Sequence, residues 1–178
     1  KEYRTVAEEC SEGNKENLEE LADKYAMKKV AKEMEQGFQG WEYKCNTVGS
    51  SRGDYPFITI TLGLDESRFG KMAAITALRV RRNGQGKAGF KKPVLFPKIV
   101  FLYDKKLHIS EDAPLHDVFE EGIETSRLTM YPDWLSLSGE GYVPRMYQTY
   151  KRVVSPMGCR AFLSPWYEKG GMIPADEN

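Results

Sequence analysis

The feature that most constrains the fold is an almost uninterrupted apolar run at residues 94–103, in which Pro97 and Lys98 are the exceptions. A strand with one solvent-facing side alternates apolar and polar residues, whereas a strand covered on both faces is apolar throughout. Strands of the second kind belong to parallel sheets, because the crossovers between parallel strands place helices on the sheet faces. We therefore expect residues 94–103 to form a buried strand of a parallel sheet.

Helices and further strands are expected on both sides of this run. Helical spacing of apolar residues predicts one helix from Asn14 or Asn17 to Gln36, closed by Gly37. A second helix is expected at residues 65–82, with Asp65 or Ser67 as its start signal and Asn83-Gly84 as its stop. Its predicted face consists of Phe69, Met72, Ala73, Thr76 and Val80. Alternating residues predict a strand at 55–62, and another strand is expected at 161–166.

A third helix is expected to open at Asp112 and Pro114, since acidic residues and proline favour the first turn. Its inward residues would be Leu115, Val118, Phe119 and Ile123, and its outward residues Glu120, Glu121 and Glu124. A short segment at residues 134–137, a helical turn from Pro144 to Tyr150 and a loop over the tail complete the prediction.

This alternation of strands and helices predicts an α/β fold made of right-handed βαβ units, with a parallel sheet covered by helices. The 178 residues are the length of one domain. We divide them into a covering helix at 1–37, alternating units at 38–154, a cysteine loop with its following strand at 155–166, and a loop at 167–178.

Charge and cysteine content exclude several classes of partner. The 26 basic and 26 acidic residues cancel, so no overall field favours a nucleic-acid backbone or an anionic membrane. No apolar run reaches the roughly 18 residues of a membrane span, and no signal segment follows Lys1. Three cysteines without C-x-x-C spacing argue against a disulfide framework and against a zinc site made by this chain alone. We expect a cytoplasmic protein.

The strongest candidate for chemistry is the turn Ser-Pro-Met-Gly-Cys-Arg at residues 155–160. Pro156 fixes its own φ and Gly158 allows the backbone to reverse, so Cys159 is expected on a shaped loop. The neighbouring Arg160 can favour a thiolate. Neither histidine carries a Cys/His signature, however, and a free cysteine is often a small buried apolar residue. From the residues alone, both interpretations of Cys159 stay open.

Other polar clusters in the sequence could bind a ligand such as phosphate, but each also has a simple structural explanation. The loop at residues 49–54 contains Ser50, Ser51 and Arg52, which can hold a phosphate or form a solvated turn, and it lacks the spacing of a P-loop. The arginines at 79, 81 and 82 fall at a helix C-terminus, where they complement the helix dipole. His116 and Asp117 are adjacent in a predicted helix and point in different directions, so we do not expect a catalytic dyad.

Four short segments resemble a known family in their order and spacing. They are Trp-Glu-Tyr-Lys-Cys-Asn-Thr at 41–47, Phe-Pro-Lys-Ile-Val-Phe at 96–101, Tyr-Pro-Asp at 131–133 and Pro-Met-Gly-Cys-Arg at 156–160. Together they resemble the catalytic subunit of the anaerobic (class III) ribonucleoside-triphosphate reductases, over nearly the whole chain. The resemblance implies that the chain contributes a parallel half-sheet with covering helices to a ten-stranded α/β barrel of the glycyl-radical-enzyme type.

The resemblance also implies a role for the cysteine loop. Cys159 would sit at the tip of a finger loop, where a glycyl radical oxidises it to a thiyl radical that abstracts the 3′ hydrogen of the ribose. Met157, Gly158 and Arg160 would shape this loop. Asn46, Ser50, Ser51 and Arg52 are weaker candidates for substrate binding or loop shaping, because their segment would lie on the substrate-facing side of the barrel.

Cofactors and partners are likewise expectations from the resemblance. No cofactor is expected to bind within this chain; the full-length enzyme implies a glycyl radical, a structural zinc and ATP or dNTP effectors. Implied partners are a ribonucleoside triphosphate substrate, a radical-SAM activase and a second copy in a homodimer. Because the chain begins with Lys1 rather than methionine, we expect a piece of a longer protein that is inactive when isolated.

Two alternative functions remain open at this point. One is a glycyl-radical enzyme of the formate-lyase type, which shares the barrel and the finger-loop cysteine. The other is a non-catalytic nucleotide-binding or interaction module that uses the loops at residues 49–54 and 84–92.

Overall fold

The computed structural model of the chain describes residues 15–49, 51–55, 57–150, 156, 166–168 and 171–173. The helices are α2 (Lys15–Thr47), α3 (Arg68–Asn83), α4 (Lys105–His108), α5 (His116–Thr129) and α6 (Tyr142–Tyr150). The strands are β1 (Thr59–Leu62), β2 (Lys98–Tyr103), β3 (Asp133–Ser136), β4 (Trp166–Glu168) and β5 (Gly171–Ile173).

Three parallel strands form the main sheet, in the order β1-β2-β3. Ile60 of β1 lies opposite Ile99, and Phe101 of β2 lies opposite Trp134. Helix α3 connects β1 to β2, and α4 and α5 connect β2 to β3. The predicted α/β class, with a parallel sheet and covering helices, is confirmed.

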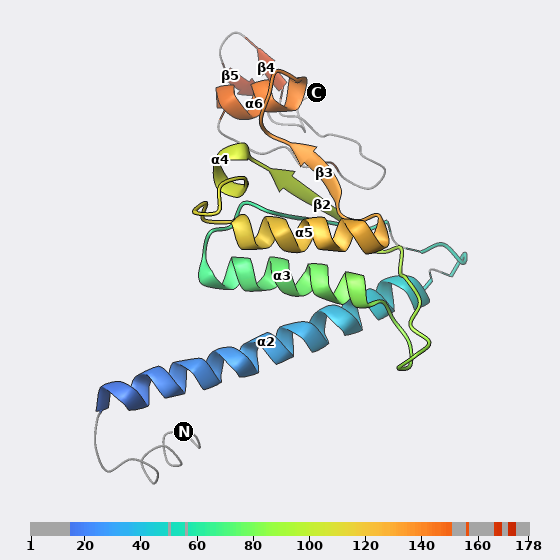
Figure 1. Cartoon of the computed structure of the whole chain (residues 1–178). Coiled ribbons are helices and arrows are strands. Elements are labelled where there is room, and N and C mark those ends of the chain that lie inside the picture. Colours follow the sequence, from blue (N-terminus) through green and yellow to red (C-terminus); the bar gives the residue numbers. More distant parts are fainter. Residues whose placement is uncertain are drawn as a thin grey trace.

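Helices α3 and α5 run side by side along one face of this sheet (Figure 1). The core on this face joins Leu78 of α3, Ile99 and Phe101 of β2, and Val118 of α5. Leu115, which precedes α5, belongs to the same buried cluster. Burial of these large apolar side chains is the main stabilising contribution to this layer.

The opposite face of the sheet is also covered. Val100 and Leu102 of β2 are buried there with Leu137, and Val143 and Tyr147 of α6 pack against them. Successive side chains of a strand point to opposite faces, so burial of both sets requires apolar residues at every position. This explains the uninterrupted apolar run and confirms the buried strand, although β2 begins at Lys98 rather than at residue 94.

Helix α2 differs most from the prediction. It continues through Gly37 and Gly40 to Thr47, so Gly37 does not close it. A glycine inside a helix costs about 1 kcal/mol relative to alanine, which tertiary contacts can offset. Those contacts come from the last turns of α2, where Glu42 and Cys45 are buried. Nearer its start, α2 also contacts α3, because the Asp23 carboxylate accepts two hydrogen bonds from the Arg68 guanidinium, and the first turns of α2 lie away from the sheet (Figure 1).

Two other boundaries also needed correction. The strand predicted at residues 55–62 begins only at Thr59, and Tyr55 and Phe57 are exposed. In the tail, β4 pairs with β5 in an antiparallel hairpin, so the loop predicted for residues 167–178 is wrong at these positions. Most of the strand predicted at residues 161–166 falls outside the described residues.

The helix signals were correct for α3, whereas α5 begins at His116 rather than at the predicted Asp112 and Pro114. Ser67 caps α3 by accepting a hydrogen bond from the Gly70 N–H, and Gly84 ends the helix, as predicted. Of the predicted α3 face, Val80 is buried but Phe69 is exposed. In α5, Val118 points inward as predicted, whereas Ile123 is exposed.

Within the described ranges, β1 and β3 are the edges of the parallel sheet. Continuation of this sheet into a ten-stranded barrel therefore stays a prediction.

Candidate functional site

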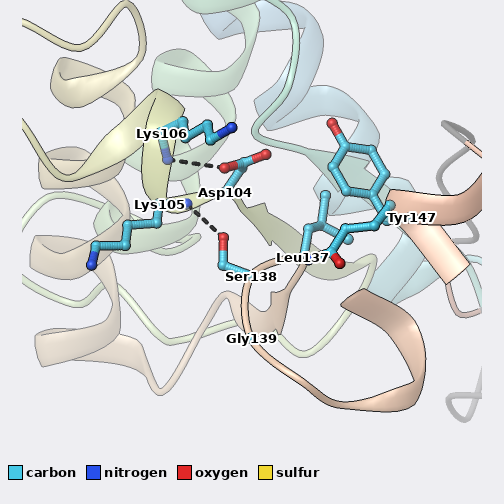
Figure 2. A pocket seen from close by; sticks show the side chains of 8 residues that line it. Asp104, Lys105, Lys106, Leu137, Ser138, Gly139 and Tyr147 are labelled. Carbon is cyan, nitrogen blue, oxygen red and sulfur yellow. Dashed lines mark hydrogen bonds between the residues drawn. The ribbon is translucent and has the colours of Figure 1, made fainter. Parts of the chain in front are cut away.

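A pocket of about 430 Å³ lies at the carboxyl ends of β2 and β3. Residues 104–106 after β2, residues 137–139 after β3, and Tyr147 and Gln148 of α6 line it (Figure 2). Open parallel sheets characteristically bind ligands at the carboxyl ends of their strands. The pocket is therefore the best candidate for a binding site among the described residues.

The turn after β2 is held by Asp104. Its side chain caps α4 by accepting a hydrogen bond from the Lys106 N–H, at 2.9 Å. Its backbone N and O both lie within hydrogen-bonding distance of Nδ1 of His108. A carboxylate at this position is a preferred N-cap, which explains why the chain turns into a helix directly after the strand.

His108 supports this turn from inside the core. Its side chain is fully buried and its ring lies against those of Phe101, Tyr103 and Phe119. The His108 backbone carbonyl lies 2.9 Å from Nδ1 of His116, and His116 Nε2 lies 3.5 Å from the Glu120 carboxylate. We conclude that both histidines have structural contacts, and that His116 and Asp117 form no dyad, as expected.

The end of β3 is tied to the same turn. The Lys105 N–H donates to Ser138 Oγ at 2.9 Å, and the Leu137 N–H donates to the Tyr103 carbonyl at 2.7 Å. Gly139 follows with φ of 111°, a left-handed conformation that favours glycine. These bonds hold the two strand ends in a fixed relation around the pocket.

The pocket can bind polar and anionic groups through side chains. The first backbone N–H groups of α4 already donate to Ser138 and Asp104, so they are not available to a ligand. Side-chain donors around the pocket come from the two lysines, Ser138, Tyr147 and Gln148, whereas Asp104 supplies the one carboxylate of the lining.

A buried ion pair lies at the amino ends of β2 and β3, opposite the pocket. Arg81 of α3 donates from Nε to Glu42 Oε1 of α2 at 2.8 Å and from Nη2 to the Pro97 carbonyl. Its guanidinium lies 4.8 Å from the centre of the Tyr131 ring. Pro97 precedes β2 and Tyr131 precedes β3, so this one cation contacts the chain at the entry to both strands.

Burial changes the acid–base properties around this pair. Desolvation raises the pKa of the Glu42 carboxyl, despite the opposing charge of Arg81. Burial also raises the pKa of the Cys45 thiol, and the nearby Glu42 charge adds to the effect. Cys45 is therefore held as a neutral thiol rather than as a nucleophile.

The arginine cluster at the end of α3 has specific partners. Arg81 is in the buried pair, and Arg79 and Arg82 both form salt bridges with Glu121 of α5, at 2.8 and 2.6 Å. Glu121 is accordingly turned towards α3, so the prediction of an outward Glu121 is wrong. Ion pairing between helices, beyond the helix dipole, explains the three arginines.

Among the candidate site residues, Asn46 lies at the end of α2 and binds the turn before β2. Its amide nitrogen donates to the carbonyls of Glu42 and Phe96, and its oxygen accepts from the N–H groups of Leu95 and Phe96. These four bonds use both ends of the side-chain amide. They join the end of α2 to the turn before β2, and the substrate-binding or loop-shaping role predicted for Asn46 stays a prediction.

Ser51 and Arg52 lie in an exposed turn between α2 and β1. This turn approaches the sheet at the amino end of β1, whereas the pocket lies at the carboxyl ends of β2 and β3. The structure therefore does not bring Ser51 and Arg52 together with the pocket.

The cysteine loop falls outside the described residues, and so does Ser50. Cys159, Met157, Gly158 and Arg160 have no described position, and of this segment only Pro156 is described, as a buried residue. Their predicted roles are neither supported nor opposed by the geometry.

Sequence reasoning missed the residues that line the pocket. The available signal was positional for residues 104–106, which directly follow the buried strand at the end where ligands usually bind. Residues 137–139 lie at the end of the short segment expected at 134–137, which was not recognised as a strand. Nothing in the composition of these two short segments marks them as unusual.

Two absences concern the described part of the chain. Its His, Cys, Asp and Glu side chains form no group of three or more that could hold a metal ion. None of its helices is both long and apolar enough to cross a membrane.

Comparison with known proteins identifies the family. The family model described as anaerobic ribonucleoside-triphosphate reductase matches residues 11–176. An anaerobic ribonucleoside-triphosphate reductase of Enterobacteria phage T4 is 34% identical over 169 residues, which cover 94% of this chain and 27% of the relative. Proteins of the same name from Haemophilus influenzae and Escherichia coli are 36% and 33% identical, over 86% and 84% of this chain.

The chain spans 27%, 21% and 20% of the lengths of these three curated relatives. The match covers the buried strand, the pocket and the cysteine loop in one continuous stretch. The chain belongs to the anaerobic ribonucleoside-triphosphate reductase family.

Proposed function

We propose that this chain is part of the catalytic domain of an anaerobic ribonucleoside-triphosphate reductase, and that Cys159 is its radical-bearing residue. In a longer polypeptide it would contribute to the conversion of ribonucleoside triphosphates to 2′-deoxyribonucleoside triphosphates. The observation that carries the proposal is the continuous family match over residues 11–176, which includes the Met-Gly-Cys-Arg turn.

Two features of the fold agree with this proposal. The parallel sheet with helical layers is the kind of scaffold that can form one part of an α/β barrel. The pocket lies at the carboxyl edge of that sheet, where a substrate would be expected. In the chain, the cysteine loop follows α6, whose Tyr147 and Gln148 line this pocket.

The proposed chemical step is a hydrogen-atom transfer. The thiyl radical of Cys159 takes the hydrogen from C3′ of the ribose, so that an S–H bond forms, the C3′–H bond breaks, and the unpaired electron moves to the sugar carbon. The overall reduction requires an electron donor, which the family resemblance gives as formate or a thiol protein. A glycyl radical would supply the oxidising equivalent that forms the thiyl radical.

The partners of the whole protein are part of the same proposal. They are a radical-SAM activase, a second copy of the polypeptide and nucleotide effectors. The structural zinc would belong to another part of a longer polypeptide. We expect the 178-residue chain alone to show no reductase activity.

The test is a Cys159→Ser substitution in the longer polypeptide that contains this chain. Deoxynucleotide formation should fall to background, because an alcohol O–H bond is too strong for a glycyl radical to oxidise. Cys10→Ser is the matched control, since Cys10 precedes the residues that the family model matches, and it should retain turnover within about twofold of the parent. Turnover that survives in Cys159→Ser at the level of this control would refute the assignment.

A further inference from the structure

We propose that an apolar surface at the amino ends of β1 and β2 packs against another segment of the longer polypeptide, which contributes apolar side chains to the contact. We call this surface the amino-end patch; its centre is Phe57, Leu95 and Phe96, and Val48 and Tyr55 flank it. The inference goes beyond the radical chemistry proposed for the cysteine loop. It rests only on the proposal that the chain is part of a longer polypeptide.

The centre of the amino-end patch is exposed although it lies beside the buried sheet. Phe57 is 61% exposed and lies two residues before β1, and Leu95 is 65% exposed and lies three residues before β2. The rings of Phe57 and Phe96 meet edge to face, with their centres 5.1 Å apart, so two segments of the chain form one surface. Apolar surfaces of this kind mark contacts with other protein segments.

The backbone beneath the amino-end patch is fixed. The N–H groups of Leu95 and Phe96 both donate to Asn46 Oδ1 at 3.2 Å, and the Phe96 carbonyl accepts from the Asn46 amide nitrogen at 2.6 Å. The Leu95 carbonyl accepts from the Tyr131 hydroxyl at 3.2 Å. Because these four backbone groups are already bound, Leu95 cannot turn inward without breaking hydrogen bonds, and a partner cannot pair with this segment as a strand. The partner must therefore make its contact through side chains.

The residues around the amino-end patch indicate the chemistry of its partner. Residues 55–62 and 93–97 contain no charged side chain, so a charged partner would meet no opposite charge in these two stretches. The central part of a protein interface is typically poor in charged residues and rich in aromatic ones. We therefore expect the partner segment to present aliphatic or aromatic side chains.

The longer polypeptide is the best source of this segment. The chain spans 27%, 21% and 20% of the lengths of three curated relatives, so most of such a protein lies outside it. The exposed parts of the five patch side chains amount to roughly 400 Å², taking about 200 Å² for a whole aromatic side chain, whereas a stable complex buries about 800 Å² on each partner. A second copy would therefore need further contacts. A segment of the same polypeptide does not, because covalent connection gives it a high effective concentration.

The experiment is hydroxyl-radical footprinting of the longer polypeptide, with oxidation of individual side chains measured by mass spectrometry. Phe57 and Leu95 should be oxidised at least about tenfold more slowly than in the same protein unfolded in urea, because a covered side chain reacts only when the covering segment opens. Phe90, which is 82% exposed on the loop before β2, is the comparison of the same residue type. Protection of Phe57 no greater than that of Phe90 would overturn the proposal. Protection that disappears on dilution to the monomer would also overturn it, in favour of a second copy.

Two exposed leucines provide matched variants of the longer polypeptide. Leu95→Asp places a charge in the proposed contact, and an unpaired charge is not buried, so the segment should separate and oxidation of Phe57 should rise at least about fivefold. Leu128→Asp, at an exposed position of α5, should leave oxidation of Phe57 within about twofold of the parent. Continued protection of Phe57 in Leu95→Asp, or an equal rise in both variants, would overturn the proposal. Footprinting needs no turnover, so this proposal and the assignment of Cys159 can fail separately.

Discussion

Arg81 joins three parts of the molecule through one buried side chain. It is 1% exposed, and it binds Glu42 of α2, the Pro97 carbonyl before β2 and the face of the Tyr131 ring before β3. Such contacts offset the cost of desolvating two buried charges. Removal of one partner from a buried pair typically lowers the free energy of unfolding by about 3–5 kcal/mol. The pair therefore links the end of α2 to the entry points of two strands.

Glu42 gives a prediction about pH. Burial raises its pKa above the ordinary value of 4.5, so the folded chain binds this proton more tightly than the unfolded chain does. The contribution of Glu42 to the free energy of unfolding is then greatest below pH 4.5 and falls as the pH rises through the raised pKa. In a Glu42→Gln variant this fall should be absent.

Urea unfolding of both proteins at several pH values measures the effect. The free energy of unfolding of the parent minus that of Glu42→Gln should decrease as the pH rises above 4.5, the ordinary value of the Glu42 pKa. Glu33→Gln, on an exposed part of α2, serves as the control and should show no comparable trend. A difference that rises with pH would mean that Arg81, rather than burial, determines the pKa of Glu42.

For single residues, the sequence predicted local roles such as helix capping better than it predicted contacts between residues far apart in the chain. Ser67 and Gly84 were found because caps depend on local chemistry. Arg81 was assigned to the helix dipole because its partner Glu42 lies 39 positions away, beyond any local pattern. The pocket residues were missed for the same reason, since Lys105 and Ser138 meet only when β2 and β3 pair.

Among the elements, α2 shows how a local stop signal can be overridden. Gly37 and Gly40 both lie inside the helix, and a Cβ built at either position would meet nothing within 4 Å. Neither glycine is required by close packing or by an unusual φ. The helix continues because its last turns supply Glu42, Cys45 and Asn46 to the body of the protein.

Two glycine substitutions test this account. Gly40→Ala should raise the free energy of unfolding by up to about 1 kcal/mol, because alanine is the better helix former and has room. Gly122→Ala in α5 should lower it by about 1–3 kcal/mol, because the new Cβ would lie 2.9 Å from Trp134 Cη2 and 3.2 Å from Phe101 Cε2. Chemical unfolding monitored by circular dichroism gives both values. A destabilised Gly40→Ala protein would show that the helix is bent or broken at this residue.

The strands expected at residues 55–62 and 94–103 exist, but both are shorter than predicted. The continuous apolar run correctly indicated a strand covered on both faces, since Ile99 and Phe101 face α3 and α5 while Val100 and Leu102 face α6. The residues just before Lys98 and Thr59 lie outside the strands, and among them Leu95 and Phe57 are exposed whereas Val94 is buried. The residue at which a strand begins depends on its pairing with a neighbouring strand, and the apolar pattern of the sequence does not show that pairing.

For the whole molecule, the central claim is that this chain forms one portion of a larger catalytic sheet. The family match, and the coverage of only 20–27% of the length of each relative, agree with this claim. Within the described residues β1 and β3 are edge strands, with backbone groups that another strand could pair. In a barrel both edges would be closed by neighbours.

Amide hydrogen exchange at β1 (Thr59–Leu62) and β3 (Asp133–Ser136) tests this claim most directly. The measurement compares the 178-residue chain with the longer polypeptide that contains it, and β2, paired on both sides already, is the internal reference. We predict that the outward-facing amides of β1 and β3 exchange at least about tenfold more slowly in the longer polypeptide, because they gain hydrogen-bond partners there. Equal exchange at both edge strands in the two proteins, with β2 protected in each, would contradict the claim.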